Sequence, residues 1–108
     1  MNFHIFDKNW YHTYIECILS QVSHQFIHFY FSEGFVLLWK KGDDFVAVGD
    51  RIVNPGDARL QLVKETNGNT LVISLAEEVD AGDYVCQVST YKPIEIKHSV
   101  KIRGKPFL

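Results

Sequence analysis

The 108-residue sequence lacks the features by which several large classes of protein are recognised. Its formal net charge is −2, with 11 basic against 13 acidic residues, so it offers no basic surface for nucleic acid. No stretch reaches the roughly 18 consecutive apolar residues of a membrane-spanning helix, and no signal-peptide pattern opens the chain. Neither a glycine-rich phosphate loop nor an Asn-x-Ser/Thr glycosylation sequence occurs. We therefore expect no nucleic acid, no small-molecule substrate and no cofactor, and contact with a membrane only through parts absent from this chain.

The residues that catalysis or metal binding would need are not arranged for either purpose. His24 and His28 are spaced four residues apart and His12 is nearby, but no adjacent carboxylate or thiol completes a zinc site. The paired acids at 43–44 and 77–78 lie in turn-like stretches, where we expect them to be solvated. No nucleophile has a base placed beside it. We expect a protein that is not an enzyme and that holds no metal.

The most distinctive motif that is present is Asp-Ala-Gly-Asp-Tyr-Val-Cys at residues 80–86. A Tyr two residues before a Cys is typical of a tyrosine corner, in which the phenol bonds back to nearby backbone. Trp39 offers a large apolar surface on which the sulfur of Cys86 can pack. Arg59 is the available partner for the carboxylate of Asp80, which stands six residues before the Cys.

The second half of the chain has the pattern of a β-protein. Alternating or continuous apolar residues predict strands at 35–41, 45–48, 59–64, 71–75, 84–89 and 95–103. Asn-Pro-Gly-Asp and Asn-Gly-Asn sequences mark two of the turns between them. The alternation places Leu71, Ile73 and Leu75 on one side of their strand and Ile96, His98, Val100 and Ile102 on one face of theirs. It points Tyr84, Cys86 and Val88 inward.

Taken together, the motif at 80–86, Trp39 and Arg59 resemble the variable and intermediate sets of the immunoglobulin fold. The resemblance implies an all-β, antiparallel sandwich over residues 35–103, with the six predicted strands as C, C′, D, E, F and G. Residues 104–108 would be a linker or tail. The residues to which it gives a structural role are Trp39, Arg59, Leu71, Ile73, Asp80, Gly82, Tyr84 and Cys86.

Residues 1–34 fit this fold poorly, so strands A and B are uncertain and the sandwich is possibly incomplete. Strand B would carry a Cys about 11–14 residues before the Trp, whereas Cys17 lies 22 residues before it. In one interpretation residues 14–19 are a divergent strand B, with Cys17 inward and paired with Cys86 in a disulfide. In the other, apolar residues between 11 and 26 follow the spacing of an amphipathic helix that is foreign to the sandwich, or the segment is unfolded. Both interpretations remain open.

A narrower resemblance is carried by three stretches: residues 35–42, 80–87 and 98–102. They are similar to the first domain of neural cell-adhesion molecules of the lachesin, klingon, amalgam and IgLON type. This implies an extracellular, cell-surface protein that binds another immunoglobulin-superfamily protein, of its own or another kind, through the C–C′–F–G face. The residues that would contact the partner are Val36, Leu38, Lys40, Val85, Gln87 and Lys101. The alternative is a structural intermediate-set domain of an intracellular muscle protein, in which the same motif occurs without a disulfide.

Overall fold

Nine β-strands and one short 3₁₀ helix form the part of the chain that the computed structural model describes, residues 2–18, 36–65, 68–89 and 94–104. The elements are β1 (Asn2–Asp7), β2 (His12–Ile18), β3 (Leu37–Lys41), β4 (Asp44–Val48), β5 (Arg51–Ile52), β6 (Leu60–Glu65), β7 (Gly68–Ser74), η2 (Glu78–Asp80), β8 (Gly82–Val88) and β9 (Ile94–Arg103). Each of the six predicted strands is present with ends shifted by up to three residues. The two-residue strand β5 had no sequence signal of its own.

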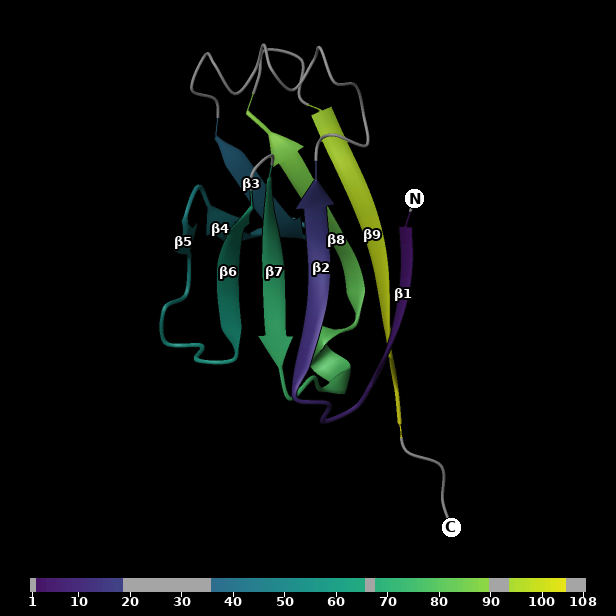
Figure 1. Cartoon of the computed structure of the whole chain (residues 1–108). Helices are drawn as coiled ribbons and strands as arrows, with labels where there is room; N and C mark the ends of the chain where they lie inside the picture. Colours follow the sequence, from purple (N-terminus) through teal and green to yellow (C-terminus); the bar gives the residue numbers. More distant parts are fainter. Residues whose placement is uncertain (1, 19–35, 66–67, 90–93, 105–108) are drawn as a thin grey trace.

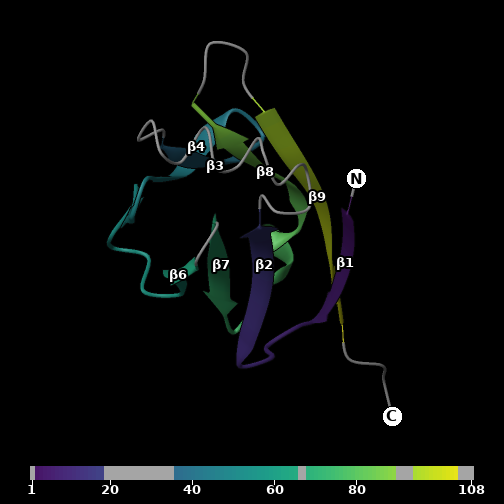
Figure 2. The same cartoon turned by 45° about the horizontal axis from the view of Figure 1, so that its top comes forward.

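The strands form two sheets packed face to face (Figures 1 and 2). The larger sheet has the order β1-β9-β8-β3-β4-β5, and the smaller has the order β2-β7-β6. All neighbouring strands are antiparallel except β1 and β9, which run parallel. Tight turns at Gly42 and Gly49, whose φ angles of 59° and 63° suit glycine, connect β3 to β4 and β4 to β5. The antiparallel sandwich that the sequence predicted is therefore confirmed.

The N-terminal residues supply the two strands that the sequence left uncertain. Strand β2 pairs with β7, and Thr13, Ile15 and Cys17 are buried while Tyr14 and Glu16 are exposed. This two-residue period is that of a strand, so the helix interpretation is wrong for His12–Ile18. Residues 19–34 lie outside the described part of the chain. The sandwich begins well before residue 35, because β1 and β2 complete its two sheets (Figure 1).

The core lies between the two sheets and is centred on Trp39, which is 0% exposed. The other large side chains that are fully buried are Ile15, Cys17, Leu71, Ile73, Cys86 and Val100. Leu75, expected to share the face of Leu71 and Ile73, is instead 49% exposed. The expectation was wrong because β7 ends at Ser74 and the backbone then turns, with a φ of 51° at Leu75.

Within the described residues, no helix is long and apolar enough to span a membrane.

Candidate protein-interaction face

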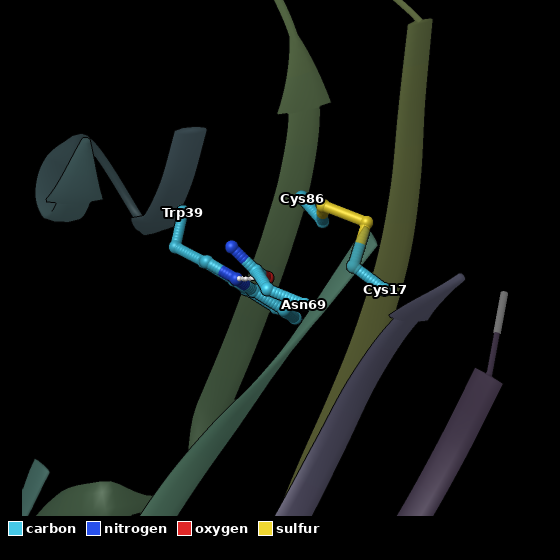
Figure 3. Close-up of a disulfide and its surroundings, with 4 residues drawn as sticks. All are labelled: Cys17, Trp39, Asn69 and Cys86. Carbon is cyan, nitrogen blue, oxygen red and sulfur yellow. Dashed lines mark hydrogen bonds between the residues drawn. A yellow bond between two sulfur atoms is a disulfide. The ribbon is translucent and has the colours of Figure 1, made fainter. Parts of the chain in front are cut away.

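A disulfide and a buried indole hold the two sheets together (Figure 3). The disulfide joins Cys17 of β2 to Cys86 of β8, and their Cα atoms are 6.1 Å apart. Beside it, the indole N–H of Trp39 donates to Oδ1 of Asn69 on β7 at 2.6 Å. This bond satisfies a polar group that would otherwise be buried without a partner. Sequence reasoning missed Asn69, because its Asn-Gly-Asn context indicates a turn and gives no sign of burial.

The lower end of the sandwich is closed by an ion pair between the two sheets. Nη1 and Nη2 of Arg59 donate to the two carboxylate oxygens of Asp80 at 2.6 and 3.1 Å. The backbone N–H of Glu77 donates to Asp80 at 2.8 Å, and the hydroxyl of Tyr84 donates to the Asp80 carbonyl at 2.6 Å. Burial acts to raise the pKa of Asp80, but the hydrogen bonds from Arg59 and Glu77 outweigh it, so the pKa lies below its ordinary value. Gly82 lies close by, with a φ of 140° at the start of β8.

On the other side of the larger sheet, alternate residues of the central strands point away from this core. Leu37 and Trp39 are buried, so Leu38 and Lys40 of β3 face outward, and Val36 precedes them with 39% exposure. Leu38 is paired with Gln87, and Lys40 with Val85, both on β8. Five of the six predicted contact residues therefore lie together on two neighbouring strands.

The sixth predicted residue, Lys101, lies apart from this group. It is on β9 opposite Ile5 of β1, four residues along from Lys97, which is the β9 neighbour of Val85. Four residues of strand correspond to about 13 Å. Lys101 therefore shares the outer face with the other five residues but not their immediate neighbourhood.

The structure adds four exposed apolar residues to this face that the sequence analysis did not include. Phe45 and Val48 of β4 are 49% and 38% exposed and are paired with Lys40 and Leu38. Phe3 and Ile5 extend the face along β1. Plain alternation would place Phe45 and Val48, which are three residues apart, on opposite faces. The irregular register between β3 and β4 brings both to this face. Nothing local indicated that β1 would join this sheet, because its pairing with β9 spans almost the whole chain.

No protein-family model matches this sequence, and no curated protein sequence matches it. Solved structures do. The ZIG-8 IG1 domain, crystallised as a homodimer, gives a TM-score of 0.76 at 17% identity over 97% of this chain and 81% of that one. The Dpr11 IG1–DIP-gamma complex gives 0.74 at 20% identity over 95% of this chain and 99% of the matched chain. The Ig1 domain of mouse SynCAM 2 gives 0.74 at 17% identity over 98% and 96%. The chain has the immunoglobulin fold.

The strand order is that of a variable-type immunoglobulin domain. The larger sheet corresponds to strands A′, G, F, C, C′ and C″, and the smaller to strands B, E and D. The candidate face is thus the outer face of the C–C′–F–G strands, which are β3, β4, β8 and β9. Throughout the described ranges no group of three or more His, Cys, Asp or Glu side chains is placed to hold a metal. Of the histidines weighed as ligands, His24 and His28 lie outside those ranges.

A pair of histidines lies at the inner side of β1 and β9, the A′ and G strands of this fold. Nε2 of His4 on β1 is 2.9 Å from Nδ1 of His98 on β9. His98 is 2% exposed, its ring lies 5.7 Å from that of Trp39, and its Nε2 meets no hydrogen-bond partner among the described residues. Burial, together with the neighbouring His4, lowers the pKa of His98 to about 4. Burial also lowers the pKa of His4.

The lowered pKa values of His98 and His4 predict that mild acid destabilises the domain. The unfolded chain takes up a proton at His98 below its ordinary pKa of 6.5, whereas the folded chain does so only near pH 4. Each pKa unit is worth about 1.4 kcal/mol, so the free energy of unfolding should fall by about 3 kcal/mol between pH 6.5 and pH 4. Urea denaturation at a series of pH values measures this fall. His98→Gln should remove most of the slope and His12→Gln, an exposed control, should keep it; an unchanged midpoint between neutral pH and pH 4 would contradict the prediction.

Proposed function

We propose that this domain is a cell-surface recognition and adhesion module that binds another immunoglobulin-superfamily protein through the outer face of β3, β4, β8 and β9. The observation that carries the proposal is the group of apolar side chains on this face, which the packing of the domain itself does not use. They are Val36, Leu38, Phe45, Val48 and Val85. Around them stand polar and charged residues such as Gln87 and Lys40. An apolar centre with a polar rim is the usual anatomy of a protein–protein interface.

Domains of the same fold support a partner of this class. The ZIG-8 IG1 and RIG-5 IG1 domains each form a homodimer, and the two together form a heterodimer. Dpr11 IG1 is bound to DIP-gamma in its crystal structure. The sequence resemblance to lachesin and IgLON-type adhesion molecules points the same way, and we propose that this chain shares their kind of pairing without being an enzyme.

The disulfide favours an extracellular location over the alternative of an intracellular muscle protein. Disulfides form and persist in secreted and surface proteins, and they are rare in the cytosol. The muscle-type domain is expected to carry the same motif without the bond, whereas here Cys17 and Cys86 are joined.

A charge placed in the centre of the face tests the proposal. Leu38→Asp puts a carboxylate where an apolar contact is expected, so binding to immunoglobulin-superfamily ectodomains should weaken by more than about tenfold. The measurement is surface plasmon resonance of the purified domain against a panel of such ectodomains, including the domain itself. Val63→Asp on β6 is the matched control, because it places the same charge at an apolar residue, 45% exposed, of the other sheet. Equal binding by both variants would reject this face.

A further inference from the structure

Two lysines flank the centre of the proposed face on a single line across three strands. Lys40 on β3 is paired with Val85 on β8, and Val85 is paired with Lys97 on β9. Neighbouring strands are about 4.8 Å apart, so the two lysines stand roughly 10 Å from each other with the half-buried Val85 between them. Nζ of Lys40 lies 5.5 Å from the centre of the Phe45 ring, which steadies that ammonium group at the edge of the apolar patch.

Neither lysine takes part in an ion pair among the described residues. The ion pairs found in the described part of the chain involve Arg59 and Arg103, and none involves Lys40 or Lys97. The outward charges of β3, β4, β8 and β9 that are outside ion pairs are Lys40, Lys97 and Lys101 against Asp83 and Glu95. Directly across the strands from Val85, on both sides, the charge is positive, although the chain as a whole has a net charge of −2.

This charge pattern discriminates between a second copy of the chain and a different partner. In a two-fold symmetric dimer the same patch is present on both sides, so a face centred on Val85 meets its own lysines. A two-fold axis that runs along β8 near Val85 would place Lys40 of one copy opposite Lys97 of the other. Like charges brought together at an interface cost several kcal/mol, while opposite charges speed encounter and set the register.

We infer that the partner is a different immunoglobulin-superfamily chain whose opposing face carries carboxylates at the positions that meet Lys40 and Lys97. The inference rests on the proposed function, since it concerns the same face. The domain alone should be monomeric. Its association with the partner should be fast at low salt and should slow as salt is added, because the attraction between the two faces is screened.

A mixture of the wild-type domain with a charge-reversed variant of itself tests the inference. The double variant Lys40→Glu/Lys97→Glu carries the carboxylates that we assign to the partner, so it should form a one-to-one complex with the wild-type domain. Analytical ultracentrifugation should show monomers for each protein alone and a complex in the mixture, lost at high salt. A mixture of wild type with Lys64→Glu, a charge reversal on β6 of the other sheet, should give no complex.

The outcomes separate this inference from the proposed function. A wild-type dimer that Leu38→Asp abolishes would overturn the heterophilic inference and leave the proposed face standing. A mixture of wild type with the double variant that stays monomeric would also overturn the inference, whereas the Leu38→Asp binding assay judges the face independently. In that assay, Lys97→Glu should reduce the association rate with the bound ectodomain by about tenfold, and Lys64→Glu should not. Equal rates for the two variants would count against the role of Lys97.

Discussion

Replacing both cysteines with alanine should lower the free energy of unfolding by about 4 kcal/mol, because the disulfide closes a loop between residues 69 positions apart. In the unfolded chain this cross-link removes conformational freedom that the open chain would otherwise have. The bond also ties β2 to β8, so it fixes the N-terminal strands that have the least distinctive sequence. Urea denaturation of Cys17→Ala/Cys86→Ala against the oxidised wild type measures the loss.

Chemical reduction of the wild-type protein provides the control for this variant. It breaks the same bond without creating a cavity at either site, and should give a loss of similar size. If reduction costs much less than the double substitution, the difference belongs to packing at the two buried sites. A loss below about 1 kcal/mol in both experiments would contradict a stabilising role for the cross-link.

The second large effect is expected from Asp80→Ala, which should cost about 3 kcal/mol of unfolding free energy. The substitution leaves the Arg59 guanidinium without its two hydrogen-bonded oxygens and the Glu77 N–H without its acceptor. The loss is costly because several hydrogen bonds to a buried carboxylate disappear together, although the Arg59 side chain, 28% exposed, keeps part of its hydration. Thermal or urea unfolding measures the change.

Asp83→Ala is the control for this loss, because Asp83 is exposed on β8, the strand that follows Asp80, and should change stability by no more than about 0.5 kcal/mol.

The dependence of stability on pH gives an independent check of the ion pair. The pKa of Asp80 is lowered in the folded state, so its contribution is present above its ordinary pKa of 3.8 and is lost as the pH falls below it. The pH range in which the Asp80 contribution is lost lies below the range in which the His98 contribution is lost, so the two contributions can be measured separately. A wild-type and Asp80→Ala difference that stays constant through strong acid would contradict the ion-pair explanation.

The strands from β3 onward were predictable because their local sequence agrees with their place in the sheets. Alternating apolar residues in β8 place Tyr84, Cys86 and Val88 inward, as the structure has them. Leu75 shows the limit of this reasoning: a strand's alternation continues in the sequence after the backbone has left the sheet. A turn with a positive φ at a leucine gives no compositional warning.

The N-terminal strands were ambiguous because the same residues satisfy two periods. Between 11 and 18, apolar residues fit both a helix face and a strand face, and a short segment cannot favour one by itself. Pairing of β2 with β7 and the bond to Cys86 settle the matter through contacts with residues far away in the chain. The parallel pairing of β1 with β9 is equally non-local.

For the proposed face, strand alternation was enough to say which side chains of β3 and β8 point outward. It was not enough to show that Lys97 and Phe45 belong to the same patch, or that Lys101 stands apart from it. Those facts depend on the register between strands, which backbone hydrogen bonds set.

From the amino-acid sequence came the central strands and many residues of the core, since burial period and turn chemistry are local properties, while the sandwich followed from the resemblance carried by Trp39, Arg59 and the motif at 80–86. Tertiary structure decided the edges of the sheets, the partner of Cys17, the acceptor for the Trp39 indole and the line of lysines across Val85. Each of these joins positions far apart in the chain, and the free energy that selects them appears only when the two sheets close on one another.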